Sequence, residues 1–303
     1  MRIVAALGGN ALLRRGETMT LEHMRLNIRS AVNALAPLAH AHQLVITHGN
    51  GPQIGIIALQ NEAGSEEARN PLDVLGAQSQ GMIGYLIEQE MRNVLGNERA
   101  VATLLTQVVV GADDAAFLHP SKPIGLHYDE TQAREMERER GWKMMRDGAK
   151  WRRAVVSPRP LDIPDIDVIE ALVAKNVVTI CLGGGGVPVA RSDDGALHGV
   201  EAVIDKDLAS SLLAQRLHAD ALLLLTDVDA VYDDWREGKS KPLRRALASS
   251  LDPMRYEAGT MRPKIEAAKS FAMAGGLCAI GKLEQAAALL AGKAGTLVSV
   301  EDE

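Results

Sequence analysis

The stretch RIVAALGGN, from Arg2 to Asn10, joins a short apolar run to two glycines and an asparagine. Its apolar part, Arg2 to Leu7, predicts a first strand that ends in a tight turn. The same kind of run recurs further along the chain, and these runs predict further strands buried on both faces. They are QLVIT (Gln43–Thr47), VVTICL (Val177–Leu182) and ALLLLT (Ala221–Thr226), while AVATLLTQVVV (Ala100–Val110) predicts one long strand or two.

Helical patterns alternate with these runs. Leu21 to His40 carries apolar residues at helical spacing, and similar patterns follow Val177–Leu182 and Ala221–Thr226. Alternation of strands and helices indicates a mainly parallel sheet with helices on both sides. The sequence therefore predicts an α/β fold.

Glycine-rich loops follow three of the predicted strands. They are Gly8-Gly9-Asn10, His48-Gly49-Asn50-Gly51-Pro52 and Gly183-Gly184-Gly185-Gly186. Glycine lets the main chain approach a ligand closely, and a loop that opens a helix points free N–H groups at a phosphate. A single loop of this kind could be a plain turn. Three loops at the carboxyl end of one parallel sheet favour a ligand site there.

Two lysines follow in contexts that suit an anion. Lys206 lies in VIDKDLASSLLA (Val203–Ala214), between a strand-like run and an apolar helix, and Asp207 follows it. Asp207 is interpreted either as a helix N-cap or as a carboxylate that orients lysines. Pro263 suits the first turn of a helix and places Lys264 near its positive end, where an anion would make the lysine tolerable. Taken alone, Lys264 could equally be an ordinary surface lysine.

Lysines without a nucleophile or a metal cluster suit phosphoryl transfer, which needs positioning and charge neutralisation more than covalent help. The sequence contains no GxGxxG fingerprint and no GxxxxGK[ST] P-loop. The eight histidines show no metal-ligand spacing, and no protein-held metal site is predicted. Only His48, within a glycine loop, is a histidine of interest.

One segment departs from the alternation of strands and helices. Between Tyr128 and Arg153 nearly every other residue is charged, and Glu130 to Arg140 predicts an exposed helix. WKMMRDGAKWRRAVV then predicts a hairpin with Asp147-Gly148 as the two turn residues. Residues 112–153 are interpreted as an excursion from the main sheet, either a lid or a solvated insertion with no chemical role.

Composition limits the classes of partner. The net charge is −6, which argues against a nucleic-acid partner. Apolar residues make up 47% but aromatic residues only 3%, so the core is expected to be built from Ala, Leu, Val and Ile. Cys181 and Cys278 lie in apolar runs and are expected to be buried, reduced thiols. With neither a signal peptide nor a membrane-spanning stretch predicted, a cytoplasmic protein is expected.

The chain resembles the amino acid kinase superfamily and, within it, the carbamate kinases, over almost its whole length. VEAVIDKD (Val200–Asp207) and SKPIG (Ser121–Gly125) are specific to carbamate kinases. The other segments that carry the resemblance are ALGGNALLRRGE (Ala6–Glu17), THGNGPQIG (Thr47–Gly55), PLDVLGAQSQGMIGY (Pro71–Tyr85), TQVVVGADDAAF (Thr106–Phe117), GGGGVPV (Gly183–Val189), LLTDVDAVY (Leu224–Tyr232) and MRPKIEAA (Met261–Ala268).

The resemblance implies one domain over residues 1–303. Its expected fold is a three-layer αβα sandwich around an open, mainly parallel sheet of about eight strands, with residues 112–153 as a protruding lid subdomain. It also implies a homodimer. The implied reaction converts carbamoyl phosphate and ADP into carbamate and ATP, with Mg²⁺ on the nucleotide.

The resemblance also implies roles for individual residues. Lys206 and Lys264 would neutralise the transferring phosphate, Asp207 would hold them, and Lys122 would reach in from the lid. Lys206 would replace the first-strand lysine of many superfamily members, since Ala5 and Ala6 occupy that region. The phosphoryl and carbamoyl groups would be cradled by Gly8, Gly9, Asn10, Gly49, Asn50 and Gly51. The nucleotide pocket would be lined by Thr226, Asp227, Tyr232 and Met261.

Two departures from the family pattern bear on local geometry. Arg262 stands where the family usually has glycine, and Leu126-His127 stand where it usually has Gly-Pro. Arg262 is expected either to add charge beside the nucleotide phosphates or to point outward into solvent.

Three other functions remain as alternatives. One is a kinase for another small carboxylate, such as acetylglutamate or aspartate, although the missing first-strand lysine and SKPIG disfavour it. A non-enzymatic sensor of nucleotide or metabolite is disfavoured because all four residues Lys122, Lys206, Asp207 and Lys264 are present. The third is an interaction protein that uses the charged excursion.

Overall fold

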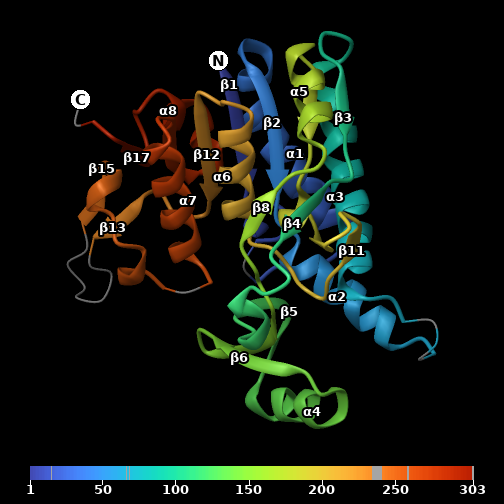
Figure 1. Ribbon diagram of the computed structural model, residues 1–303. Helices are drawn as coiled ribbons and strands as arrows, with labels where there is room; N and C mark the ends of the chain where they lie inside the picture. The colour runs from blue at the N-terminus through green and yellow to red at the C-terminus, as the bar shows by residue number, and fades with distance from the viewer. Residues whose placement is uncertain (15, 66, 68, 234–240, 258, 302–303) are drawn as a thin grey trace.

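An eight-stranded sheet forms the centre of the molecule (Figure 1), for which the computed structural model describes residues 1–14, 16–65, 67, 69–233, 241–257 and 259–301. Neighbouring strands pair in parallel, apart from β16 and β17, which are antiparallel. In spatial order the strands are β15 (Arg245–Leu247), β17 (Thr296–Ser299), β16 (Leu277–Lys282), β12 (Ala221–Thr226), β1 (Arg2–Leu7), β2 (Gln43–His48), β9 (Val178–Ile180) and β3 (Val101–Thr103). The predicted mainly parallel sheet of about eight strands is confirmed.

Helices cover both faces of this sheet. Successive side chains of β1 point to opposite faces, and both sets are buried. Ile3, Ala5 and Leu7 belong to one buried cluster, and Val4 and Ala6 belong to the other. The first cluster is completed by α1 (Leu21–Ala41), α3 (Leu72–Leu95) and α8 (Ala286–Leu290); the second is completed by α5 (Ile166–Ala174), α6 (Lys206–Arg216) and α7 (Met261–Met273). The architecture is therefore three-layered, and both cysteines are buried within the second cluster.

The ends of the three central strands lie level with one another. Leu7 of β1 pairs with His48 of β2 on one side and with Leu225 of β12 on the other. The loops that follow these strands therefore all leave the sheet on one side, at the carboxyl ends of the strands. Helix α2 (Gly51–Glu62) begins on this side of the sheet, three residues after β2 ends.

Smaller elements flank the main sheet. The predicted strand Ala100–Val110 is two strands in different sheets, since β3 ends at Thr103 and β4 belongs to a second, four-stranded sheet. That sheet has the order β11 (Leu197–Gly199), β10 (Val187–Arg191), β4 (Gln107–Val110) and β8 (Pro160–Asp162), and β13 (Val231–Asp233) pairs with β14 (Lys241–Leu243). Short 3₁₀ helices are η1 (Gly9–Ala11), η3 (Ala115–Leu118), η4 (Gly183–Gly185), η6 (Ala248–Ser250), η7 (Pro253–Arg255) and η8 (Leu283–Gln285).

A three-stranded sheet and one helix project from the main body (Figure 1). They are β5 (Lys122–Tyr128), β7 (Lys150–Val155), β6 (Lys143–Asp147) and α4 (Glu130–Arg140), and we call them the projecting segment. Helix α4 has the predicted bounds, because Asp129 caps its first turn and Gly141 ends it in a left-handed conformation. The predicted hairpin turn was wrong by one residue: Asp147 pairs with Lys150, which leaves Gly148 and Ala149 as the turn.

The projecting segment meets the body through both side-chain and main-chain contacts. Ile124 of β5 and Val155 of β7 are buried in one cluster with Ile54 of α2. A Cβ placed on Gly55 of α2 would lie only 1.9 Å from Gly125 Cα of β5, so the two main chains touch directly. Pro123 of β5 also lies beside Gly259, just ahead of α7. Among the described residues, no helix is both long enough and apolar enough to cross a membrane.

Candidate active site

One carboxylate and two lysines meet at the carboxyl ends of the central strands. Asp207 Oδ1 accepts a hydrogen bond from Lys206 Nζ, and its Oδ2 accepts one from Lys264 Nζ at 2.8 Å. Lys206 and Asp207 occupy the first turn of α6, whereas Lys264 occupies the first turn of α7 next to Pro263. All three side chains are nearly buried. The sequence prediction that these residues act together is consistent with this geometry.

The cluster carries one uncompensated positive charge in a poorly solvated place. Burial alone would raise the pKa of Asp207, but the charges of Lys206 and Lys264 outweigh it and hold that pKa well below its usual range. Burial also lowers the pKa of Lys206. For Lys264 burial acts in the same direction, but the charge of Asp207 outweighs it and raises its pKa. Such a site attracts an anion, because a bound anion neutralises the remaining charge.

The helix cap of α6 is Asp205, which corrects the interpretation of Asp207 as a cap. Asp205 Oδ1 accepts from the main-chain N–H groups of Asp207 at 2.9 Å and Leu208 at 3.4 Å. Its other oxygen, Oδ2, accepts from Lys122 Nζ at 2.7 Å. Lys122 is the first residue of β5, so a lysine of the projecting segment reaches the start of α6. Asp205 was not predicted as the cap, although an Asp directly before a helix is a standard cap signal.

The first two glycine loops converge on Lys206. A Cβ placed on Gly49 would lie 3.4 Å from the amide nitrogen of Gly9 and 3.5 Å from Lys206 Cδ. Gly8 follows β1 and donates its N–H to Leu225 of β12 at 3.0 Å, and Gly51 is the first residue of α2. Gly49 therefore borders Lys206 and lies against Gly9, while Gly8 and Gly51 continue the two loops. The side chain of Asn10 lies outside the described part of the structure.

The third glycine loop is buried and supports the second. The main chain of Gly184 has φ +66°, and a Cβ there would lie 2.1 Å from Asn50 Nδ2. Asn50 is buried and donates from Nδ2 to Ser79 Oγ at 2.8 Å, which fixes its amide group. His48 is also fully buried beside Gly183, and burial lowers its pKa to about 4. His48 is consequently neutral and holds the loop in place.

A pair of hydroxyl groups links β2 to α6, and this link was not predicted. Thr47 Oγ1 of β2 and Ser210 Oγ of α6 lie 2.6 Å apart in the interior, and Ser210 Oγ also donates to the main-chain oxygen of Lys206. This link fixes the first turn of α6 against the end of β2. Nothing in the sequence indicated it, because the partners are 163 positions apart.

The residues expected to line a nucleotide pocket lie at the end of β12, in β13 and at the start of α7. Thr226 ends β12 and donates from Oγ1 to Asp227 Oδ1 at 3.2 Å. Tyr232 of β13 donates from its hydroxyl to Asp229 at 2.8 Å. Met261 is the first residue of α7, three positions before Lys264.

The departures from the family pattern have local partners. Arg262 is half-buried and donates from Nε to the main-chain oxygen of Tyr256 at 3.2 Å, so it braces the segment ahead of α7. It lies in the first turn of α7. Leu126 and His127 lie where the pairing of β5 with β7 shifts register, and His127 Nε2 lies 3.2 Å from Asp147 Oδ2.

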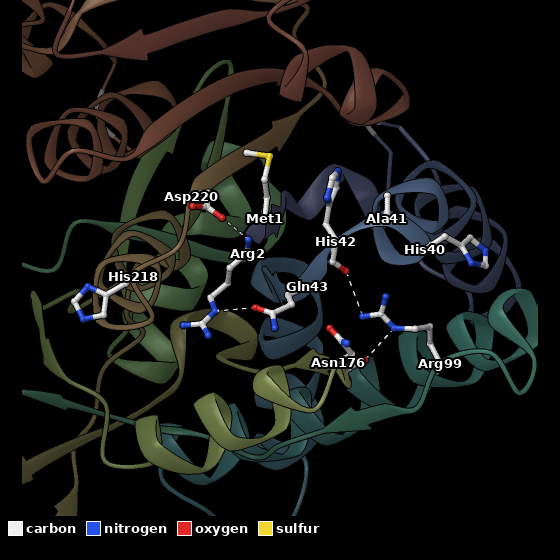
Figure 2. Close-up of a pocket in the computed structure, with 10 residues that line it drawn as sticks. All are labelled: Met1, Arg2, His40, Ala41, His42, Gln43, Arg99, Asn176, His218 and Asp220. Carbon is white, nitrogen blue, oxygen red and sulfur yellow. Dashed lines mark hydrogen bonds between the residues drawn. The ribbon is translucent and has the colours of Figure 1, made fainter.

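A hollow of about 610 Å³ lies at the opposite, amino-terminal ends of the strands, where β1 and β2 begin (Figure 2). Its arginines already have main-chain and side-chain partners. Arg2 donates to Gln43 Oε1 at 3.2 Å, and Arg99 donates to the oxygens of Asn176 and His42 at 2.9 and 3.3 Å. These contacts hold the starts of the strands against the ends of the neighbouring helices. The arginines that line this hollow therefore have structural roles.

Comparison with known proteins gives a consistent family. The model of the amino acid kinase family matches residues 1–280. A carbamate kinase of Rhizobium meliloti is 48% identical over 99% of this chain and 93% of its own, and one of Escherichia coli K12 is 48% identical over 98% and 99%. The solved carbamate kinase from Giardia lamblia bound to citric acid is 39% identical, with a TM-score of 0.91 over 98% of both chains. The chain therefore belongs to the amino acid kinase family and, within it, to the carbamate kinases.

Proposed function

We propose that this enzyme moves a phosphoryl group reversibly between carbamoyl phosphate and ADP, giving carbamate and ATP. The observation that carries the proposal is the trio of Lys206, Asp207 and Lys264 beside the loops of Gly8–Gly9 and Gly49–Gly51. Phosphoryl transfer needs two oxygens held in line and the charge between them neutralised. Two fixed ammonium groups beside these glycine loops suit both requirements.

The residues divide the work along the site. Lys264 starts at the nucleotide side, on α7, and stabilises charge on the oxygen that bridges to ADP. Lys206 lies against Gly49 and stabilises the transferring phosphoryl group. Asp207 takes no proton in this scheme, because its pKa is far too low, and it keeps both lysines charged and in position. Relatives support the use of nucleotide, since one solved Giardia lamblia carbamate kinase, 38% identical, is bound to AMP-PNP.

We further propose that Mg²⁺ enters with the nucleotide. Among the described residues no group of three or more His, Cys, Asp or Glu side chains could hold a metal by itself. Mg²⁺ usually keeps water and the phosphate oxygens of a nucleotide as its ligands, so the nucleotide itself would supply most of its coordination. Bound in this way, the metal lowers the charge on the phosphate oxygens. The lysines would then neutralise what remains.

We propose that residues 112–153 of a single domain, which include most of the projecting segment, form a lid that covers carbamoyl phosphate. Lys122 supports this role, because it reaches the start of α6 from β5. Amide exchange measured with and without both substrates should show added protection in this segment when they bind. Lys122→Ala should raise the KM for carbamoyl phosphate more than that for ADP. Identical protection in both states would make the segment a static insertion.

The assembly and location of the enzyme are also proposals. Exposed apolar side chains on two helices that pack against each other, Leu26 of α1 and Tyr85 of α3, support a homodimer. Light scattering on the purified enzyme would measure its mass directly. The two buried, free cysteines support a reducing, cytoplasmic location. The net charge of −6 disfavours a nucleic-acid partner.

A coupled assay for ATP tests the proposed function directly. Purified enzyme, MgADP and carbamoyl phosphate should yield ATP, and the enzyme should not phosphorylate acetylglutamate or aspartate from ATP. ATP formation from carbamoyl phosphate that depends on enzyme concentration supports the proposal. Its absence, together with turnover of one of the amino-acid substrates, would assign the enzyme to another branch of the family.

A further inference from the structure

We propose that Arg152, on β7 of the projecting segment, binds the carbamoyl end of the substrate. The inference rests on the proposed function and adds a residue to its substrate site. Arg152 comes from the same segment as Lys122, but the two side chains reach different parts of the site. Lys122 contacts the start of α6, whereas Arg152 lies against the start of α2.

The guanidinium group of Arg152 is held in place on two of its three nitrogens. Its Nε donates to the main-chain oxygen of Gly125 at 3.1 Å, and its Nη1 donates to Asp147 Oδ2 at 3.2 Å. Its side chain is 14% exposed. The third nitrogen, Nη2, makes no hydrogen bond to any residue in the described part of the chain. It would lie 3.6 Å from a Cβ on Gly51, at the first residue of α2.

The alternation along β7 explains why Arg152 faces the site. Its two neighbours, Trp151 and Arg153, point the other way, since Arg153 lies over the ring of Trp142 and Arg134 lies over that of Trp151. A strand places consecutive side chains on opposite faces. Two arginines in sequence therefore meet different parts of α2: Arg153 lies with Gly55 and Ala58, whereas Arg152 lies beside Gly51.

The order of contacts across the site assigns the part of the substrate that Arg152 would meet. Met261 and Lys264 lie on the nucleotide side, Asp207 links Lys264 to Lys206, and Lys206 borders Gly49. Gly51 comes next, two residues further on, and Arg152 lies beside it. The transferring phosphoryl group is placed at the lysines, so the carbamoyl oxygen is the group left for Arg152. A guanidinium N–H suits an oxygen of that kind, which becomes a carboxylate oxygen in carbamate.

Steady-state kinetics of four proteins test the assignment: the wild type, Arg152→Gln, Arg152→Lys and Arg146→Gln. Losing a hydrogen bond from a charged donor should raise the KM for carbamoyl phosphate roughly ten- to a hundredfold in Arg152→Gln. The KM for ADP should change less than about twofold. Lys cannot reproduce the fork that binds Gly125 and Asp147, so Arg152→Lys should also show a raised KM for carbamoyl phosphate.

Arg146→Gln is the matched control, because it removes the same charge from an exposed position over Trp151 on the same hairpin. It should leave both KM values near those of the wild type. If Arg152→Gln does not fold by thermal melting, Arg152→Lys carries the test.

Three outcomes would overturn the inference. A KM for carbamoyl phosphate that stays at the wild-type value in both Arg152 variants removes Arg152 from the substrate site. An equal rise in both KM values would show a role in shaping the segment only. A wild type that makes no ATP from carbamoyl phosphate would remove the proposed function, and this inference with it; the first two outcomes leave that function standing.

Discussion

Lys264 of α7 and Asp207 of α6 form a 2.8 Å ion pair between residues 57 positions apart. The pair joins the first turns of two helices that pack on the same face of the sheet. Because Asp207 also binds Lys206, movement of either helix start would disturb both lysines. The charge of the site is therefore set by how α6 and α7 pack.

Lys264→Ala should lower kcat by roughly a hundredfold to a thousandfold, since one fixed electrostatic contact to a transition state contributes about 3–4 kcal/mol. Lys269→Ala is the control on the same helix, because Lys269 donates only to the main-chain oxygen of Leu251. Turnover of both variants in the coupled ATP assay, after thermal melts establish folding, decides the matter. Near-normal turnover of folded Lys264→Ala would remove this lysine from the mechanism.

Asp207→Asn should lower kcat and stability together. The amide keeps the shape of the carboxylate but leaves two buried ammonium groups without a counter-charge, which should cost roughly 1–3 kcal/mol in the free energy of unfolding. Asp162→Asn breaks an exposed pair with Arg216 and should cost well under 1 kcal/mol. Urea unfolding at neutral pH compares the two variants.

Asp207 also predicts a pH dependence. Its pKa in the folded protein lies below the ordinary value, so its contribution to stability is fully present above about pH 4 and is lost as the pH falls further. The free energy of unfolding of Asp207→Asn should consequently fall less steeply than that of the wild type in this acidic range. Parallel curves for the two proteins would contradict the assigned ion pairs.

His48 predicts a second loss of stability, at higher pH. Its folded pKa of about 4 lies below its ordinary 6.5, so the unfolded chain takes up a proton first as the pH falls. The contribution of the neutral imidazole, about 3 kcal/mol in full, should be present above pH 6.5 and be lost between pH 6.5 and 4. His48→Gln should flatten the curve of unfolding free energy in this range. His198→Gln, an exposed control, should leave the slope unchanged.

Gly184→Ala should destabilise the protein more than Gly195→Ala does. Both glycines have positive φ, of +66° and +89°, so both substitutions impose a backbone cost of roughly 1 kcal/mol. Only at Gly184 would the new methyl group collide with Asn50, while nothing lies within 4 Å at Gly195. The difference between the two unfolding free energies therefore measures the contact with Asn50. Equal losses would show that the loop moves aside freely.

Much of the fold could be predicted because its signals are local. The strand Ala221–Thr226 and the helix Glu130–Arg140 have the predicted bounds, since an apolar run defines the first and Asp129 and Gly141 define the second. The division of Ala100–Val110 between two sheets could not be predicted. That division depends on pairing with β9 and β10, which lie some 75 to 85 positions away.

The types of residue in the site could be predicted better than the contacts between them. The resemblance selected Lys206, Asp207 and Lys264, and the structure brings them together. Which aspartate caps α6 depended on a shift of two residues in the helix start, which propensity alone does not resolve. Arg152 lies in a hairpin that was predicted with its turn one residue out of place. The alternation of side chains along a strand shows that there are two faces, but not which of them meets α2.

The contact of Gly55 with Gly125 has a consequence for how such an enzyme can diverge. The two main chains touch there without intervening side chains, so a side chain added at Gly55 would displace the projecting segment. The many charged residues on its outer surface can then accumulate substitutions without displacing Lys122 or Arg152. Mutational tolerance should be high across α4 and abruptly low at these two glycines, so that the rate of sequence change varies sharply within one small segment.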